Sequence, residues 1–432
     1  MEETFFIETW GCQMNDLDTQ RLAGQLKLRG YRRVQSEQEA GLILLNTCSI
    51  REKSEQKMFS HLGRLRDAKA RGAKIGVCGC VAQQEGEAIL RRAPYVDFVM
   101  GPGQVGFLDE ILAGGSGHVA VDFPGQRKYD YLAIDRPSAV RAQVTVIEGC
   151  NKNCTFCIVP TTRGREISRP LTEILNEVRH ARSTGRVEIE LLGQTVNAYR
   201  CPVSGADFAD LLREVASIAG VKRLRFITSH PAEVNERMIA ALRDHPNICR
   251  YLHLPVQSGS SAVLRRMKRL YTRERYLEVI ARIREAVPEM RFSTDIIVGF
   301  PGETDADFEQ TLSMLEEMRY VFLYAFKYSP RPGTPAVRLP DPVADDIATE
   351  RVNRVFALQE KIEREILASF RGKIVPILVE GPSRNDTSMM SGKTDDNWTV
   401  NFRVKEPVAV GEMISVEIQE ASHHSLRGEA AA

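Results

Sequence analysis

The sequence predicts an α/β protein in three parts: a parallel, Rossmann-like α/β layer, an open barrel of six strand–helix units, and a small β-barrel. Three observations predict this. Strand and helix patterns alternate up to about residue 100, a strand-then-helix unit recurs from residue 142 to 369, and short strands separated by Gly, Asn and Asp turns follow residue 370. At 432 residues, the chain fits two or three domains better than one core.

The composition excludes several classes of protein. Hydrophobic residues make up 43% and charged residues 27% of the chain, as in soluble globular proteins. The 58 basic and 57 acidic residues leave a formal charge of +1, so binding to nucleic acid would depend on local patches. Apolar runs such as 42–45 and 296–298 are too short to span a bilayer, and the start has no signal-peptide pattern. We therefore expect a cytoplasmic enzyme.

The first segment predicts a parallel sheet with flanking helices. Strand patterns cover residues 5–10, 42–45 and 74–77, and helical periodicity covers residues 16–29 and 51–71. Such alternation is typical of a parallel α/β layer, because each helix crosses back over the sheet.

A cysteine follows each of these three strands, at Cys12, Cys48 and Cys80. In open parallel sheets ligands bind beyond the carboxyl ends of the strands, so these thiols could converge on one site. Buried free cysteine is also common, and spacing alone leaves the two interpretations about equal. Cys78 lies inside an apolar strand, whereas Cys80 follows the turn at Gly79, so Cys80 is the better ligand candidate.

Residues 101–141 have little helical period and carry turn signals at 114–117 and 124–127. This pattern predicts a linker in which short segments pair as strands. The predicted domains are therefore 1–120, a linker at 121–141, a central domain at 142–369 and a terminal domain at 370–432.

The central domain carries six strand patterns, too few to close an eight-stranded barrel, so an open, partial barrel is expected. The candidate strands are 143–147, 187–192, 223–228, 250–254, 292–298 and 321–327, with helices beginning near Thr172, Asp207, Pro231, Ser261, Thr304 and Val343.

A loop after the first of these strands holds three cysteines, Cys150, Cys154 and Cys157. Their spacing lets a short backbone surround one inorganic cluster and leaves one cluster position without a protein ligand. A zinc site would need four ligands, and no fourth Cys or His lies nearby in the loop. The nine cysteines, an odd number without an export signal, favour metal-binding or catalytic thiols over disulfides.

Polar and glycine-rich segments follow the later strands, at 193–197, 229–231, 255–259 and 299–303. Catalytic groups of such barrels lie in these loops. A direct catalytic role for His230 or His253 is less expected than a structural one. The basic residues of 265–275 fit either RNA phosphates or a solvated face, and Cys201 and Cys249 have no partners at ligand spacing.

The three-cysteine loop, with Phe156 before its last cysteine, resembles the cluster loop of the radical S-adenosylmethionine (SAM) superfamily. The resemblance implies a 4Fe-4S cluster on the three thiolates, with SAM bound at its open iron and cleaved to a deoxyadenosyl radical. It places Gln194, Gly299, Pro301 and Gly302 at the SAM-binding rim. Gln194 stands where many members carry Glu after paired glycines, and Thr161 stands where an aromatic residue is frequent.

The first segment narrows the resemblance to the methylthiotransferase family. Its motifs are 9–15, 46–52 and 79–83, and the supporting stretches are 159–164, 191–197, 251–260, 294–303 and 328–334. The resemblance implies a second, auxiliary 4Fe-4S cluster on Cys12, Cys48 and Cys80. It also implies transfer of a methylthio group to carbon 2 of N6-isopentenyladenosine next to the anticodon in tRNA, with flavodoxin or ferredoxin as a low-potential electron donor to a monomeric enzyme.

Alternatives remain open at this level. Sister families act on threonylcarbamoyladenosine in tRNA or on an aspartate of a ribosomal protein. A non-catalytic iron–sulfur protein that binds RNA or carries electrons is the alternative of another class.

The terminal domain resembles TRAM, an RNA-binding module, over residues 381–400. Strand patterns cover 373–379, 398–402 and 413–417. The segment from Arg371 onward carries seven Lys or Arg against nine Asp or Glu. RNA recognition there would therefore be local rather than driven by a broad positive field.

Overall fold

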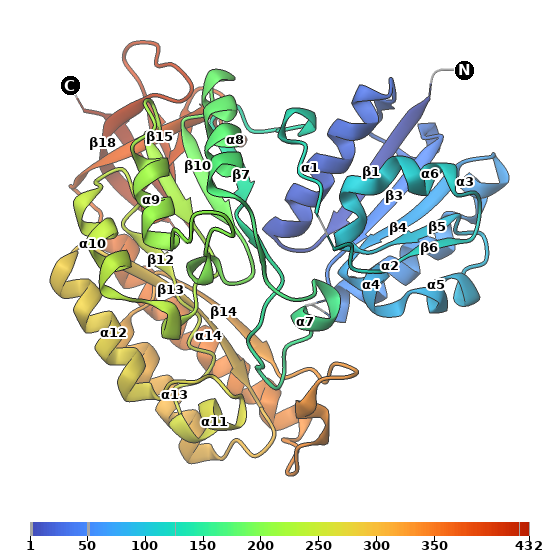
Figure 1. Cartoon of the computed structure of the whole chain (residues 1–432). Helices are drawn as coiled ribbons and strands as arrows, with labels where there is room; N and C mark the ends of the chain where they lie inside the picture. The colour runs from blue at the N-terminus through green and yellow to red at the C-terminus, as the bar shows by residue number, and fades with distance from the viewer. Residues whose placement is uncertain (1–2, 50–51, 126, 423, 432) are drawn as a thin grey trace. The chain divides into compact units, whose positions relative to one another are not determined.

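The computed structural model describes residues 3–49, 52–125, 127–422 and 424–431. The chain forms two compact units, which Figure 1 shows with their helices and strands labelled. The first consists of residues 1–137, 148–152 and 157–167, and the second of residues 138–147, 153–156 and 168–432. In the described ranges, no helix combines the length and the apolar character needed to cross a membrane.

A six-stranded parallel sheet forms the centre of the first unit, in the order β2-β1-β3-β4-β5-β6. The sheet confirms the three predicted strands and adds three short ones. The strands are β1 Thr4–Trp10, β2 Arg32–Arg33, β3 Leu42–Thr47, β4 Lys74–Gly79, β5 Phe98–Met100 and β6 His118–Ala120.

Helices cover both faces of this sheet. Leu22 and Leu26 of α1 (Gln13–Leu28) pack with Phe5 and Leu44 on one face, together with α6 (Leu108–Ala113). On the other face, α2 pairs its apolar side with Ile43 and Leu45. The helices there are α2 Glu52–Arg64, α3 Arg66–Ala70, α4 Cys80–Glu85 and α5 Glu87–Arg92. The predicted helix at 51–71 is thus divided at Leu65, and its first residue lies outside the described ranges.

Residues 101–141 were expected to have little helical period and to pair briefly as strands; β6 is such a strand, but the first part of the segment is more helical than expected. Residues 102–107 and 131–133 form the 3-10 helices η2 and η3, residues 108–113 form α6, and β6 joins the edge of the sheet. Val105, Leu108 and Ile111 are buried in the core beside α1. Three apolar residues are too few to produce a clear helical period, which is why the pattern was weak. The predicted turn at 124–127 includes Gln126, which lies outside the described residues.

The second unit contains the six predicted barrel strands. They form two three-stranded parallel sheets, β7-β10-β11 and β12-β13-β14, joined by an isolated parallel bridge between Leu224 and Ile248. This is the open, partial barrel that the six repeats predict. Its strands are β7 Arg141–Thr145, β10 Glu188–Leu192, β11 Arg223–Phe226, β12 Tyr251–His253, β13 Arg291–Val298 and β14 Phe322–Lys327.

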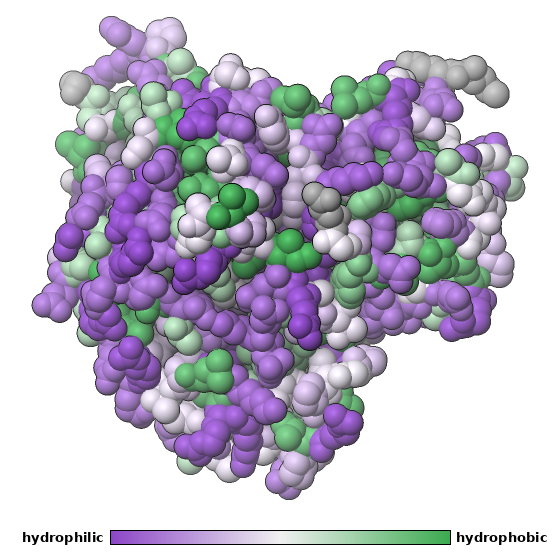
Figure 2. Space-filling view, in the orientation of Figure 1, coloured by the Kyte–Doolittle hydropathy of each residue, from purple (hydrophilic) through white to green (hydrophobic). Residues whose placement is uncertain are grey.

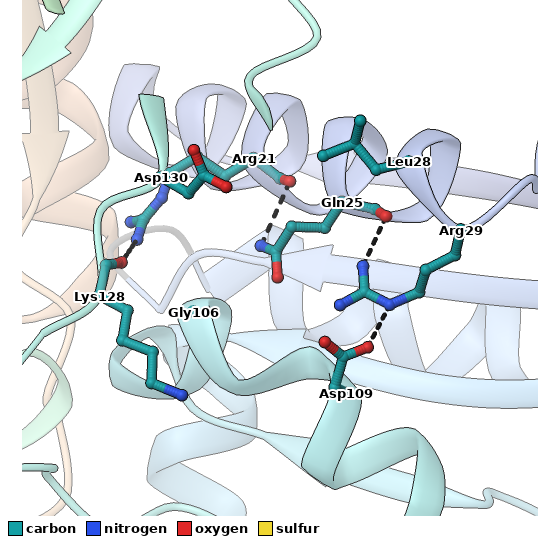
Figure 3. A pocket seen from close by; sticks show the side chains of 8 residues that line it. All are labelled: Arg21, Gln25, Leu28, Arg29, Gly106, Asp109, Lys128 and Asp130. Atoms are coloured by element: carbon teal, nitrogen blue, oxygen red, sulfur yellow. Dashed lines mark hydrogen bonds and ion pairs between the residues drawn. The ribbon is translucent and has the colours of Figure 1, made fainter. Parts of the chain in front are cut away.

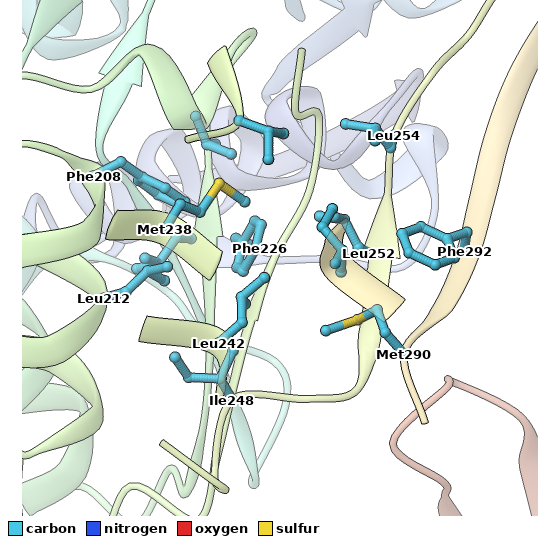
Figure 4. Close-up of a cluster of buried hydrophobic side chains, with 14 of the residues drawn as sticks. Phe208, Leu212, Phe226, Met238, Leu242, Ile248, Leu252, Leu254, Met290 and Phe292 are labelled. Atoms are coloured by element: carbon cyan, nitrogen blue, oxygen red, sulfur yellow. The ribbon is translucent and has the colours of Figure 1, made fainter. Parts of the chain in front are cut away.

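Helices surround these strands and bury one continuous apolar core, part of which Figure 4 shows with Phe208, Phe226, Leu252 and Phe292 facing one another. Capping boxes at Asp207 and Thr304 start two of the helices where expected. The helices are α8 Leu171–Ser183, α9 Phe208–Ala216, α10 Glu236–Asp244, α11 Ser261–Arg266, α12 Arg273–Ala286, α13 Asp305–Met318 and α14 Asp345–Ala368. The short elements between β7 and α8 are β8 Ile147–Glu148, α7 Val159–Thr162 and β9 Ile167–Ser168.

The terminal segment forms a closed five-stranded barrel, as its alternating strand patterns predict. Two strands, β16 and β19, are additional to the three predicted. The strands are β15 Ile374–Pro382, β16 Met390–Lys393, β17 Thr399–Arg403, β18 Met413–Ser422 and β19 Ser425–Ala430. Trp398 is buried and its ring lies 4.3 Å from that of Phe322 in β14, so the small barrel packs directly on the larger one within the second unit.

Hydrophilic residues dominate the face shown in Figure 2, and hydrophobic residues occur there in small groups. Scattered apolar residues are normal on a protein surface and need no partner.

Candidate cluster-binding sites

The first unit brings Cys12, Cys48 and Cys80 together. Cys12 follows β1 and precedes α1, Cys48 follows β3, and Cys80 begins α4 after β4. Because β1, β3 and β4 are neighbours in the parallel sheet, their carboxyl ends carry the three thiols to one edge. The Cys48 side chain forms hydrogen bonds with both Cys12 and Cys80.

These contacts favour the thiolate form of two of the cysteines. The hydrogen bond with Cys48 lowers the pKa of Cys12 to about 6 and that of Cys80 to about 7, against the opposing effect of burial. The positive charge of Arg163 lowers both pKa values further. The same hydrogen bonds raise the pKa of Cys48. Because thiolates are the ligands of iron and zinc, this group has the chemistry of a metal-binding site.

Cys78 is separate from the three. Its side chain lies in the apolar core with Phe5 and Leu44, and burial raises the pKa of its thiol. Cys78 is therefore a core residue, as the strand pattern predicts.

The backbone at Gly79 positions Cys80. Gly79 has φ +92°, and a Cβ atom there would lie 2.5 Å from Oδ1 of Asn46 and 2.7 Å from the carbonyl oxygen of Thr47. Asn46 is buried and donates hydrogen bonds to the Asn15 carbonyl oxygen and Thr19 Oγ1, both at 2.9 Å, so it has little room to move. The turn thus requires glycine.

Substitution of Gly79 with alanine is expected to displace Cys80 and to destabilise the first unit by about 1–3 kcal/mol, as for a strained backbone with a steric overlap. Iron bound per chain after anaerobic reconstitution should fall by about half, because the resemblance described above implies one 4Fe-4S cluster on Cys12, Cys48 and Cys80 and another on the three-cysteine loop. Gly72→Ala is the matched control: Gly72 also has a positive φ, but a Cβ atom there would meet no neighbour. Equal iron content in the two variants would contradict the prediction.

A group of buried charges lies beside the three thiols. Arg163 donates to Asp18 Oδ2 at 2.8 Å, and Asp18 lies 3.7 Å from Arg21. Arg21 in turn lies 3.6 Å from Glu148, which accepts a hydrogen bond from the Tyr129 hydroxyl at 2.9 Å. Burial raises the pKa of Asp18, whereas Arg21, Arg127 and Arg163 outweigh burial and lower that of Glu148.

The three-cysteine loop is divided between the compact units, with residues 148–152 and 157–167 in the first and residues 153–156 in the second. In the first, Cys150 N donates to the Gly164 carbonyl oxygen at 3.1 Å, and Lys152 N donates to Cys150 Sγ at 3.4 Å. Gly149 has φ +79°, and a side chain there would overlap the backbone of Arg165. Cys157 is half-buried.

In the second unit, Cys154 is buried and accepts a hydrogen bond from Arg269 Nη1 at 3.3 Å. Arg269 also donates to the Pro255 carbonyl oxygen at 3.1 Å and the Tyr271 hydroxyl at 2.9 Å, and it is only 6% exposed. The interpretation of residues 265–275 as one RNA-facing or solvated face is therefore wrong for Arg269. Its guanidinium ties Cys154 to the loop after β12 through these hydrogen bonds.

Other residues of that basic run have protein partners as well. Arg273 donates to Glu317 at 3.1 Å, and Arg275 donates to Glu278 at 2.8 Å. These ion pairs are on the surface and neutralise part of the positive charge that RNA phosphates would need.

The structure places the four rim residues of the SAM prediction in two loops. Gln194 follows β10 and is half-buried. The loop after β13 contains Gly299, Pro301 and Gly302 and forms a turn. Glu303 closes this turn by accepting a hydrogen bond from Gly299 N at 2.5 Å. The Glu303 carboxylate also forms an ion pair with Arg351 at 2.8 Å. Gly302 N donates to the Asp341 carbonyl oxygen at 2.7 Å. The amide of Gly299 therefore closes the turn and that of Gly302 ties the turn to Asp341, and the contact of these four residues with SAM stays a prediction.

The two histidines of the rim have structural contacts. His230 is buried, its Nδ1 accepts from Ala232 N at 3.2 Å, and it caps the 3-10 helix at 231–233. His253 Nδ1 lies 2.8 Å from Ser293 Oγ, and its Nε2 lies 3.5 Å from Asp295. Cys201 and Cys249 are buried within the second unit.

A separate surface hollow of about 520 Å³ in the first unit, shown in Figure 3, is lined by Arg21, Gln25, Leu28, Arg29, Gly106, Asp109, Lys128 and Asp130. Arg29 pairs with Asp109, Arg21 donates to the Lys128 carbonyl oxygen, and Lys128 Nζ pairs with Glu110. Since these cations already have partners within the unit, the hollow does not define a ligand site.

The fold and the cysteine loop define the class of protein. Residues 144–315 match the Radical SAM superfamily, residues 4–101 match the uncharacterised protein family UPF0004, and residues 368–431 match the TRAM domain. A radical S-adenosylmethionine methyltransferase from Kitasatospora setae has a similar fold, with a TM-score of 0.55 and 14% identity over 84% of this chain and 89% of that one.

Whole-chain relatives identify the family. The tRNA-2-methylthio-N(6)-dimethylallyladenosine synthase of Alkalilimnicola ehrlichii is 47% identical over 98% of this chain and 96% of its own length. The synthase of the same name from Syntrophotalea carbinolica is 44% identical over 99% of both chains. The chain belongs to this family of radical SAM tRNA methylthiotransferases, and it is a transferase whose cofactors are SAM and 4Fe-4S clusters.

The residues of the first unit fit a cluster of this kind. They offer three thiols, and a buried guanidinium beside them suits an anionic group. Within the described ranges, no three Cys, His, Asp or Glu side chains are spaced for a single metal ion. A four-iron cluster is a larger body that spreads its ligands further apart.

Sequence reasoning missed Arg163, Asp18 and Glu148 as parts of this site and assigned Arg269 to a surface. Arg163 lies six residues after Cys157, in the stretch 159–164 that supports the family resemblance. Its position close to the three-cysteine loop is the sequence feature that could have marked it as part of a cluster site. Its partner Asp18 is 145 positions away, so no local pattern indicates the pair.

Proposed function

We propose that this enzyme adds a methylthio group to carbon 2 of N6-isopentenyladenosine next to the anticodon in tRNA. The observation that carries the proposal is the identity of 44–47% over 98–99% of the chain to synthases named for the dimethylallyl form of this nucleoside. Sister activities on threonylcarbamoyladenosine or on a ribosomal aspartate would require a different substrate pocket.

The proposal assigns one 4Fe-4S cluster to Cys12, Cys48 and Cys80 and the other to Cys150, Cys154 and Cys157. The contact of Cys48 with Cys12 and Cys80, and the hydrogen bond from Arg269 to Cys154, support this assignment. When bound, the two clusters and SAM supply the sulfur and radical chemistry. The chain itself orients the thiols, holds Arg163 and Arg269 beside them, and buries Cys48, Cys80 and Cys154 away from water.

SAM is proposed to bind at the rim formed by Gln194, Gly299, Pro301 and Gly302. The turn at Gly299 is held by Glu303, and Glu303 is held by Arg351. This arrangement keeps the loop after β13 in one conformation, which suits a binding surface for a cofactor.

The remaining assignments complete the proposal. The domains are 1–120 with the auxiliary cluster, a linker at 121–141, the radical SAM core at 142–369 and TRAM at 370–432. The enzyme acts as a monomer in the cytoplasm, with a low-potential donor such as flavodoxin or ferredoxin.

The test is nucleoside analysis of tRNA from a deletion strain by mass spectrometry. Methylthio-isopentenyladenosine should disappear and isopentenyladenosine should accumulate, while methylthio-threonylcarbamoyladenosine stays unchanged. Restoring the gene should reverse both changes. Unchanged methylthio-isopentenyladenosine in the deletion strain would refute the substrate assignment.

A further inference from the structure

Five charged residues lie beside Cys12, Cys48 and Cys80, and their positive and negative charges do not cancel. Asp18, Arg21, Glu148 and Arg163 are buried, and so is the side chain of Arg127, which is 5% exposed. Three guanidinium groups therefore face two carboxylates, and the group carries one uncompensated positive charge. Burying such a charge is costly, so it needs an anionic partner.

The excess charge lies next to the cysteines. Arg163 is the C-cap residue directly after α7, which packs against α4, the helix that begins at Cys80. Its Nη2 donates to Asp18, whereas its buried Nη1 has no hydrogen-bond partner among the described residues. The Coulomb effect of Arg163 reaches both Cys12 and Cys80. A buried N–H donor normally has a hydrogen-bond partner. A group bound by Cys12, Cys48 and Cys80 would supply the partner that Arg163 Nη1 lacks.

Charge arithmetic identifies that partner as the cluster. Three thiolates outweigh the positive charge of the oxidised four-iron core, so the bound cluster is anionic, and reduction adds another negative charge. Net charge and hydrogen bonds to sulfur set the reduction potential of such clusters. A fixed cation nearby stabilises the reduced state more than the oxidised one.

We propose that Arg163 is a positioning residue that compensates the charge of the auxiliary cluster, with Nη1 directed to its sulfur atoms, and that it raises the reduction potential of this cluster. Asp18 holds the guanidinium in place and offsets part of its effect. The reduction takes one electron from the low-potential donor, and no bond forms or breaks. The inference rests on the proposed cluster ligands Cys12, Cys48 and Cys80.

The experiment isolates the auxiliary cluster in a chain in which Cys150, Cys154 and Cys157 are all replaced by alanine. Redox titration followed by electron paramagnetic resonance then reports one cluster. Arg163→Met should lower the reduced-to-oxidised ratio at a fixed potential about tenfold, which is about 59 mV for a one-electron couple. Asp18→Asn should shift the potential in the opposite direction, because it removes a negative charge and keeps the cation.

Two further variants separate charge from structure. Arg163→Lys keeps the charge and should shift the potential less than Arg163→Met. The double variant Asp18→Asn with Arg163→Met restores the original charge balance and should return the potential toward that of the parent. Arg29→Met, which removes a cation from the surface pair with Asp109, is the control and should leave the potential unchanged.

The outcomes distinguish the two levels of the proposal. If no cluster assembles in the parent with alanine at 150, 154 and 157, the assignment of the auxiliary ligands fails. If the cluster assembles but Arg163→Met and Asp18→Asn shift its potential in the same direction or not at all, the role of Arg163 fails. If the Arg163→Met variant fails to assemble the cluster, the reduction potentials of Arg163→Lys and Asp18→Asn test the role of Arg163, because both variants keep a cation beside the thiols.

Discussion

Substitution of Cys48 with alanine is expected to abolish methylthio transfer while leaving reductive cleavage of SAM intact. Cys48 contacts both Cys12 and Cys80, so its loss removes the central thiol of the auxiliary site. The loop at 150–157 is built by other elements and keeps its thiols. Iron content after anaerobic reconstitution should fall from about eight to about four per chain, as loss of one 4Fe-4S cluster requires. Deoxyadenosine formation and tRNA methylthiolation, measured in the same reaction, give the two readouts.

The matched control is Cys78→Ala. This residue is in the same sheet but lies in the apolar core, so it should keep both clusters and both activities at a cost of about 1 kcal/mol in stability. Cys154→Ala should show the complementary pattern, with loss of SAM cleavage and methylthio transfer together. Methylthio transfer by Cys48→Ala, or loss of SAM cleavage with four irons retained, would contradict the assignment of separate roles.

Substitution of Arg225 with methionine is expected to destabilise the second unit strongly. Arg225 of β11 is buried, donates to Glu188 Oε2 at 3.1 Å, and donates to the carbonyl oxygens of Asp395 and Thr394 at 2.7 and 2.8 Å. Neighbouring Arg223 pairs with Asp395 at 2.9 Å. These bonds hold the turn between β16 and β17 of the small barrel against β11 of the larger one.

Removing Arg225 takes the hydrogen-bonded cation away from the buried Glu188, which keeps an ion pair with Arg141 at 3.3 Å. Breaking a buried ion pair in this way costs about 3–5 kcal/mol. Denaturant unfolding should show this loss, and limited proteolysis should cut the terminal barrel sooner. The control is Arg237→Met, whose side chain is 57% exposed and pairs with Asp207 and Asp210 at the surface. It should cost less than about 1 kcal/mol. Similar losses in the two variants would show that the buried pair does not hold the small barrel.

Local pattern accounts for most of the fold. Runs such as 42–45 and 292–298 alternate with amphipathic helices, and these patterns predicted the parallel sheet and the six barrel strands. Residues 101–113 were missed because their helix is short and contributes only a few buried side chains. The strands β16 and β19 were missed because Gly392 and Gly428 interrupt the apolar pattern.

The cysteine spacing of the sequence by itself determined the class of chemistry, because the spacing of ligands around a cluster is a local property of one loop. The strand patterns also placed Cys12, Cys48 and Cys80 after strand ends, but spacing left a shared site and ordinary buried cysteines about equal, and the resemblance to the methylthiotransferases favoured the shared site. Only the tertiary structure decided which charges surround those thiols. Arg163 finds Asp18 at 145 positions away, and Arg269 finds Cys154 at 115, because burial depends on chain segments that meet in space. A surface arginine in a basic run and a buried arginine beside cysteine thiols look alike in sequence. They differ in the segments that pack around them in the folded chain.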